Sequence, residues 1–143
     1  MQLICSTDPG IVRQQIEMNP SRLLIVDDHE IFRRGLRALL EPSSDWEICG
    51  EAVDGLDAVE QCKSLKPDVV VLDVSMPRLN GLEAARLIQK ENPGSKIVII
   101  TQHDSPQIRM AAMEAGARAF VTKSAVGSEL ISALKNLIYA NGS

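Results

Sequence analysis

Short apolar runs alternate along this chain with segments of helical periodicity, and this alternation limits the fold more than any other feature. The runs are centred near Leu24, Ile48, Val70, Val98 and Val121, about every 24 residues, and apolar residues recur at helical spacing after each of them. Strict alternation of strands and helices is typical of parallel α/β sheets. We therefore predict five β/α units.

Each helical segment carries one apolar face, which should pack on the sheet. Pro42, Pro67, Pro93-Gly94 and Gly116 follow the first four segments, where they end the helices. The predicted apolar faces are Ile31, Phe32, Leu36, Leu39 and Leu40; Leu56, Val59, Cys62 and Leu65; Leu82, Ala85 and Ile88; Ile108, Ala111, Ala112 and Ala115; and Leu130, Ala133, Leu134, Leu137 and Ile138.

The strand runs indicate burial on both faces of the sheet. Residues 69–72 are apolar at every position, without the alternation of a half-exposed strand. Helices should therefore cover both faces of a parallel sheet, joined by right-handed crossovers. At 143 residues and 45% apolar content, one compact domain is the default. The predicted fold is a doubly wound α/β sheet.

Composition narrows the class of partner. A net charge of −4 and a pI near 5.2 disfavour nonspecific binding to nucleic acid or to anionic membranes. No apolar run is long enough to span a bilayer. The cysteines, Cys5, Cys49 and Cys62, are odd in number and lack CxxC spacing, as expected for reduced core thiols. We expect a cytoplasmic protein without a membrane partner.

The two ends of the chain fall outside the repeating pattern. Residues 1–20 precede the first strand run and are predicted to be an N-terminal extension or leader, whereas residues 21–140 hold the folded domain. The sequence stops in the turn-forming segment 139–143, directly after the fifth helix. We expect a further domain in a longer protein.

Polar residues follow four of the strand runs and predict a common site. Asp27-Asp28, Asp73, Thr101 and Lys123 each come where a strand ends, and open α/β sheets bind ligands at the carboxyl ends of their strands. Neighbouring carboxylates repel one another unless a cation lies among them. Hard oxygen ligands favour Mg²⁺, or Mn²⁺, over zinc.

These residue types also suit phosphoryl transfer. A carboxylate can act as the nucleophile and form an acyl phosphate, and Asp73 is the predicted nucleophile. Lys123 would supply a positive charge and the Thr101 hydroxyl a hydrogen bond to phosphoryl oxygens.

Each residue also has an ordinary structural interpretation. Asp27-Asp28 would serve as a helix cap, Thr101 and Lys123 as surface residues, and Phe120 as a core residue. The remaining polar candidates are interpreted structurally: the histidines as local polar residues and the arginines as a solvated helix face or partner contact. These residues are His29, His103, Arg33, Arg34 and Arg37.

Four motifs in order resemble the receiver domain of bacterial two-component response regulators. They are LLIVDD, VVVLDVSMP, IVIIT and AGARAFVTKS, with Gly81 opening the helix after Met76-Pro77. The resemblance covers residues 21 to about 140. Asp28-His29 and the segment 32–36 (Phe-Arg-Arg-Gly-Leu) are similar to the LuxR/NarL/FixJ-type subfamily, whose receivers precede a helix-turn-helix domain.

The resemblance implies a flavodoxin-like (βα)5 fold with strand order 2-1-3-4-5. It implies that Asp73 is phosphorylated by a sensor histidine kinase, that Asp28 contacts Mg²⁺ directly and Asp27 through water, and that the Ser75 main-chain carbonyl is another ligand. Lys123 would pair with the phosphate, and Thr101 and Phe120 would form the switch.

The implied function is that of a phosphoacceptor signalling domain that catalyses only its own phosphorylation and dephosphorylation. It would have a homodimer partner, and would reach DNA only through the missing C-terminal helix-turn-helix domain. Two rivals stay open: a haloacid-dehalogenase-like phosphatase, although Ser75 stands where that class has a second acid, and a binding module that works without phosphorylation.

Two positions depart from the family pattern. Ser124 follows Lys123 where many receivers have a proline in a cis peptide, and Gln102 follows Thr101 where many have alanine. A cis bond before a residue other than proline costs about 3 kcal/mol, so the isomer at Lys123-Ser124 stays open at this point.

Overall fold

The computed structural model describes residues 19–74 and 80–140. Most of the predicted leader, together with Ser75 and Met76-Pro77, lies outside the described residues. The described part forms one five-stranded parallel sheet in the order β3-β2-β4-β5-β6. Counted along the chain this is the order 2-1-3-4-5, which confirms the predicted doubly wound α/β fold. The strands are β2 (Ser21–Val26), β3 (Trp46–Ala52), β4 (Val69–Asp73), β5 (Lys96–Thr101) and β6 (Ala117–Thr122).

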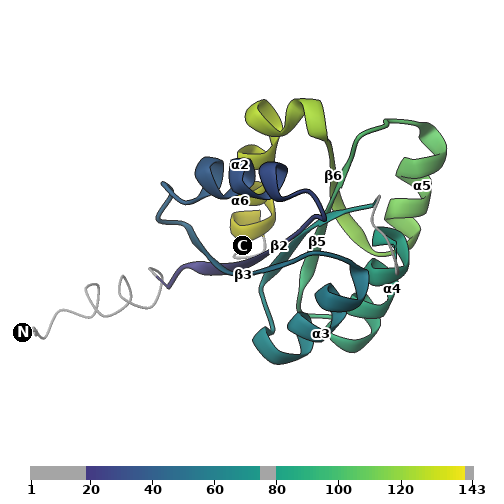
Figure 1. The fold of residues 1–143 in the computed structure, drawn as a ribbon, viewed down its shortest axis with the longest axis horizontal. Helices are drawn as coiled ribbons and strands as arrows, with labels where there is room; N and C mark the ends of the chain where they lie inside the picture. Colours follow the sequence, from purple (N-terminus) through teal and green to yellow (C-terminus); the bar gives the residue numbers. More distant parts are fainter. Residues whose placement is uncertain (1–18, 75–79, 141–143) are drawn as a thin grey trace, which may run out of the picture.

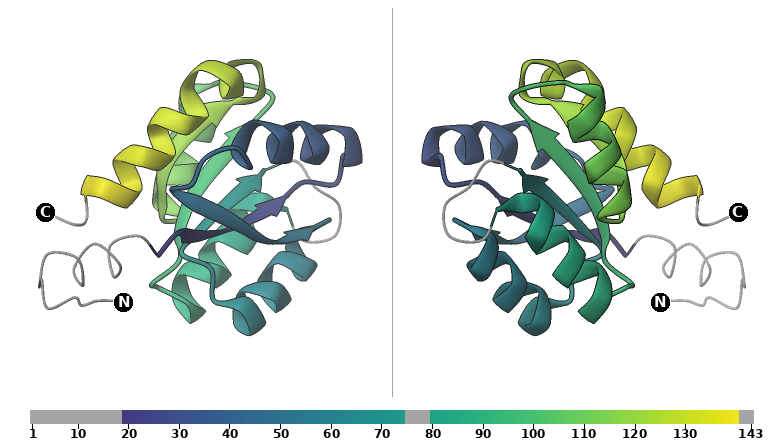
Figure 2. Two further views of the ribbon diagram at one scale, coloured as in Figure 1. Left: turned by 90° about the vertical axis from the view of Figure 1, so that its left-hand side faces the viewer. Right: turned by 90° about the vertical axis from the view of Figure 1, so that its right-hand side faces the viewer.

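Helices cover both faces of the sheet, as Figures 1 and 2 show. α2 and α6 lie on one face, and α3, α4 and α5 lie on the other. Two short turns, η1 and η2, connect the last strand to α6. The helical bounds are α2 (Glu30–Leu40), α3 (Gly55–Leu65), α4 (Gly81–Glu91), α5 (Pro106–Glu114), η1 (Lys123–Ala125), η2 (Val126–Leu130) and α6 (Ile131–Ala140).

Each face of the sheet has its own apolar core. Strand residues alternate between the two: Leu24 and Val70 pack with α3, α4 and α5, whereas Leu23 and Val71 pack with α2 and α6. All residues of β4 are buried, as expected for a central strand covered on both sides. This burial keeps β4 fixed, and with it the residue at its carboxyl end.

Two residues of the predicted apolar faces point to solvent instead. Ile31 is 85% exposed and Leu56 is 46% exposed. Leu36 and Leu40 set the buried side of α2, and at 3.6 residues per turn Ile31 falls almost opposite to them. Leu56 is likewise turned by about 120° from Cys62 and about 160° from Ala58, two residues of the buried side of α3.

The helix ends follow ordinary capping chemistry. The side chains of Asp54, Asn80 and Ser105 accept hydrogen bonds from the first turns of α3, α4 and α5. Gly116 turns the chain from α5 into β6 with φ of 103°, in the left-handed region that favours glycine. The predicted stop at this residue is therefore confirmed.

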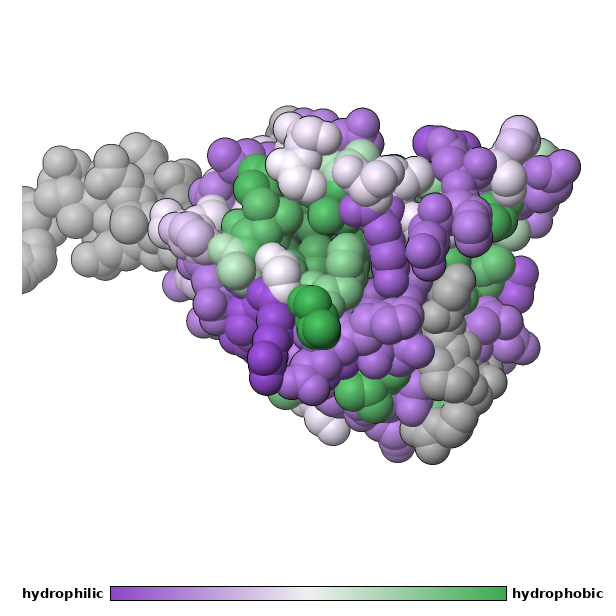
Figure 3. Space-filling model, turned by 45° about the horizontal axis from the view of Figure 1, so that its top comes forward, coloured by the Kyte–Doolittle hydropathy of each residue, from purple (hydrophilic) through white to green (hydrophobic). Residues whose placement is uncertain are grey.

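The face of the molecule shown in Figure 3 is mostly hydrophilic, and its main apolar area lies near α2 and α6. Among the described residues, no helix has both the length and the apolar character needed to cross a bilayer.

Candidate functional site

The site begins with two buried carboxylates on adjacent strands. Asp27 directly follows β2 and Asp73 ends β4, and the register of these parallel strands pairs Val26 with Leu72. The two aspartates therefore reach the sheet edge at the same level. Asp27 is 1% exposed and Asp73 is 2% exposed. Asp28 joins them, since ligand atoms of all three lie within 4.8 Å of one another.

Lys123 brings a positive charge into this carboxylate cluster from the end of β6. Its Nζ lies 3.1 Å from Asp27 Oδ2 and 3.5 Å from Asp73 Oδ2. Burial lowers the pKa of Lys123, but the carboxylates of Asp27 and Asp73 outweigh burial and hold the pKa above its usual value. The ammonium therefore stays charged at neutral pH. It also lies 4.5 Å from the centre of the Phe32 ring, a cation–π contact.

The interpretation of Asp27-Asp28 as a helix cap is wrong. The N-cap of α2 is His29, and its side chain makes no capping hydrogen bond. Asp27 Oδ1 instead accepts a hydrogen bond of 2.7 Å from the main-chain N–H of His29. This bond ties the Asp27 side chain to the segment between β2 and α2.

Arg33 anchors that turn, a role that the sequence did not reveal. It was interpreted as part of a solvated helix face or partner contact, but its side chain is only 13% exposed. The guanidinium donates to the main-chain oxygen of Asp27 at 2.7 Å and to Glu51 at 2.9 Å. Arg37 donates to the same glutamate. The available signal for this pairing was Glu51, an acid near the end of the second strand run.

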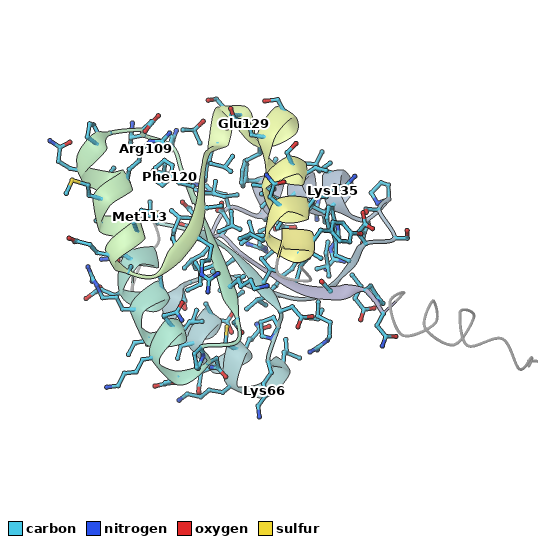
Figure 4. The ribbon with its side chains drawn as sticks, turned by 180° about the vertical axis from the view of Figure 1, so that it is seen from behind. Lys66, Arg109, Met113, Phe120, Glu129 and Lys135 are labelled. Carbon is cyan, nitrogen blue, oxygen red and sulfur yellow. The ribbon has the colours of Figure 1, made fainter. Side chains whose placement is uncertain are left out.

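Thr101 lies at the carboxyl end of β5, next to the residue that pairs with Asp73, whereas Phe120 lies further back in β6, paired with Ile99. Thr101 ends β5 and is 1% exposed, and its hydroxyl donates to the main-chain oxygen of His103 and accepts from the main-chain N–H of that residue. Phe120 is half-buried on β6, and the Arg109 guanidinium lies 4.5 Å above its ring centre (Figure 4). Asp104 holds Arg109 through two hydrogen bonds.

His29 also belongs to the site, a second role that the sequence did not reveal. It was interpreted as a local polar residue, yet its Nδ1 lies 3.2 Å from Asp27 Oδ1 and 3.1 Å from Asp28 Oδ1. Its ligand atom belongs to the same 4.8 Å group as the three aspartates. The position of His29 directly after the acid pair was the only sequence signal.

The donor set suits a divalent cation. Three carboxylates supply hard oxygen ligands, and a cation among them would relieve their mutual repulsion. Ser75 lies outside the described residues, so its predicted carbonyl ligand stays a prediction. The peptide bond between Lys123 and Ser124 is trans, which settles the isomer that the sequence left open.

Comparison with known proteins agrees with this geometry. The family model of the response regulator receiver domain matches residues 23–135. The chain belongs to this receiver domain family. Receiver domains of response regulators are signalling domains rather than conventional enzymes.

Individual relatives place the receiver among LuxR/NarL-type response regulators. Response regulator UvrY of Escherichia coli K12 is 39% identical over 115 residues, which cover 80% of this chain and 53% of UvrY. A LuxR-family response regulator from an Aurantimonas species superposes with a TM-score of 0.81 at 34% identity, covering 85% of this chain and 87% of that one. The signal receiver domain of NarL from Mycobacterium tuberculosis superposes with a TM-score of 0.79 at 32% identity, covering 83% of this chain and 96% of that one. The chain spans about half the length of the curated relative it matches.

Proposed function

We propose that this receiver accepts a phosphoryl group on Asp73 from a sensor histidine kinase. The observation that carries the proposal is the position of Asp73, buried at the carboxyl end of β4 with its Oδ2 3.5 Å from Lys123 Nζ and beside Asp27 and Asp28. A buried acid between an ammonium and two further carboxylates suits a nucleophile that needs a metal and a cation to take on phosphate charge.

The proposed step is a simple displacement. A carboxylate oxygen of Asp73 forms a bond to phosphorus while the bond from phosphorus to the kinase imidazole nitrogen breaks, and the electron pair leaves with the imidazole. Lys123, held charged by its neighbours, then pairs with the new phosphoryl oxygens. Hydrolysis of the acyl phosphate returns the free carboxylate, so the domain acts only on itself.

In this proposal Mg²⁺, or Mn²⁺, supplies charge neutralisation for the transferring oxygens. Asp28 and Asp73 would hold the ion directly, Asp27 largely through water, and Ser75 through its main-chain carbonyl. The donor chemistry of the three aspartates supports this assignment.

We propose that phosphorylation shifts an equilibrium between an inactive and an active conformation of the domain, which present different surfaces to partners. Thr101 would turn its hydroxyl from His103 toward the phosphoryl group, and Phe120 would rotate inward, away from Arg109. In this proposal the signal would alter homodimerisation and reach a helix-turn-helix domain that binds DNA, and the protein would act in the cytoplasm.

Intact mass after incubation with acetyl phosphate and Mg²⁺ tests the proposal. We expect the mass of one phosphoryl group to be added to the wild type, and no addition in Asp73→Asn or in the presence of EDTA. Asp68→Asn is the matched control, because Asp68 is exposed just before the opposite end of the same strand. Absence of an adduct in the wild type would support a module that works without phosphorylation, and steady turnover of a small phosphate ester would support a phosphatase.

A further inference from the structure

The imidazole of His29 lies on the rim of the metal pocket. Its side chain is 64% exposed, whereas those of its neighbours Asp28 and Asp27 are 29% and 1% exposed. Nδ1 is 3.1 Å from Asp28 Oδ1 and 3.2 Å from Asp27 Oδ1. His29 therefore contacts Asp27 through Oδ1, whereas Lys123 contacts the other oxygen, Oδ2, of the same carboxylate.

These separations match the spacing of ligand atoms around one metal ion. With bonds of about 2.1 Å, two neighbouring ligands of an octahedral ion are about 3.0 Å apart. The distances from His29 Nδ1 to both aspartates are close to that value, and one ligand atom from each of His29, Asp27, Asp28 and Asp73 fits within 4.8 Å. His29 Nδ1 therefore lies at ligand spacing from one oxygen of each aspartate of the Asp27-Asp28 pair.

An imidazole nitrogen changes which metal the pocket prefers. Carboxylates and water suit Mg²⁺ and Mn²⁺ alike, whereas imidazole binds first-row transition metals better than it binds Mg²⁺. We propose that His29 is a ligand of the divalent cation through Nδ1 and shifts the preference of this receiver from Mg²⁺ toward Mn²⁺ and similar transition metals. This inference rests on the proposed function, because it concerns the same ion.

The composition of the chain makes a direct test available. His29 and His103 are the only two histidines in the sequence. Pulsed electron paramagnetic resonance of bound Mn²⁺ detects a directly coordinated imidazole by the modulation from its ¹⁴N nucleus. We expect this modulation in the wild type, its loss in His29→Gln, and its retention in the matched control His103→Gln.

Binding affinities provide a second readout. Isothermal titration of the wild type and His29→Gln should show Mn²⁺ affinity falling by about tenfold and Mg²⁺ affinity changing by less than about threefold. Because the His29 side chain is largely exposed, circular dichroism should show both variants folded.

The outcomes separate the inference from the proposed function. If Mn²⁺ binds, and binding is weakened in Asp28→Asn, but the wild type shows no ¹⁴N modulation, His29 is only a hydrogen-bonding neighbour and the inference is wrong. Equal losses of Mg²⁺ and Mn²⁺ affinity in His29→Gln would also overturn the shift in preference. If neither ion binds the wild type, the metal site of the proposed function itself is refuted.

Discussion

The ammonium of Lys123 lies between Asp27 and Asp73, 3.1 Å from an oxygen of the first and 3.5 Å from an oxygen of the second. Both aspartates are almost fully buried, so their charges are poorly screened by solvent. Lys123 therefore supplies a positive charge to the buried carboxylates, and it directly follows β6, the last strand of the chain.

Replacing Lys123 with methionine should destabilise the metal-free protein. The substitution keeps an aliphatic chain against Phe32 but leaves two buried carboxylates without their ammonium, so we expect the free energy of unfolding to fall by about 1–3 kcal/mol. Urea unfolding measures this, and added Mg²⁺ should recover more stability in the variant than in the wild type. Lys135→Met, on the exposed side of α6 (Figure 4), should change stability little. A Lys123→Met protein as stable as wild type would show that the ion pairs contribute nothing.

Glu51 should make stability depend on pH in the acid range. Burial raises the pKa of Glu51, but Arg33 and Arg37 outweigh burial and hold the pKa below the usual 4.5. A carboxyl with a lowered folded-state pKa adds stability above its unfolded pKa, and this addition is lost as the pH falls through the folded pKa. Glu51→Gln should therefore cost about 1 kcal/mol at neutral pH.

Unfolding measured at neutral pH and at about pH 3 provides the comparison. The difference between the wild type and Glu51→Gln should shrink at the lower pH. Glu47→Gln, an exposed residue on the same strand, should behave like the wild type at both values. A gap that stays constant with pH would mean that the arginine pairs do not stabilise the carboxylate.

Gly81→Ala should disturb Asp73 itself. A Cβ at this position would collide with the main-chain oxygen of Asp73 and the Cα of Val74, so the backbone beside the proposed phosphoacceptor must shift. We expect a loss of about 1–3 kcal/mol in unfolding free energy and slower labelling by acetyl phosphate. Gly94→Ala is the control, because its Cβ meets nothing within 4 Å. Normal labelling of Gly81→Ala would show that the close packing is not required.

Arg109→Ala should shift the proposed switch toward its phosphorylated form. The cation–π contact with Arg109 favours the present position of the Phe120 ring, and its loss favours any state in which the ring leaves Arg109. By linkage, the population of that state should rise about two- to fivefold. The sequence contains only two phenylalanines, Phe32 and Phe120, so fluorophenylalanine labelling gives one ¹⁹F resonance for each.

The Phe120 resonance of Arg109→Ala should move part of the way toward its position in phosphorylated wild type. Arg86→Ala, an exposed arginine on α4, should leave it in place. If phosphorylation moves the Phe32 resonance but not that of Phe120, the assignment of Phe120 to the switch is wrong.

Periodicity predicted the fold because the sheet is covered on both sides. Uninterrupted apolar strands such as residues 69–72 and regular helix stops left one architecture consistent with the pattern. Periodicity predicted the buried face of each helix less accurately, because exposing a single apolar residue such as Ile31 or Leu56 costs little free energy. Position along the helix, rather than residue type, decides their burial.

The clustering of Asp27, Asp28, Asp73 and Lys123 was predictable because parallel strands bring their carboxyl ends to one edge. The contributions of His29 and Arg33 were not. Both depend on how the chain turns after β2, where Asp27 accepts the His29 N–H and Arg33 holds the Asp27 carbonyl. These two hydrogen bonds depend on the three-dimensional path of the chain and leave no periodic pattern in the sequence.

The most direct measurement locates the phosphoryl group. Borohydride reduces an acyl phosphate of aspartate to homoserine, which tandem mass spectrometry assigns to a single residue. After treatment of the full chain with acetyl phosphate and Mg²⁺, we expect homoserine at Asp73 alone, and none without the phosphodonor. Homoserine at Asp27 or Asp28 in place of Asp73, or its absence from the treated chain, would contradict the assignment of Asp73 as the phosphoacceptor.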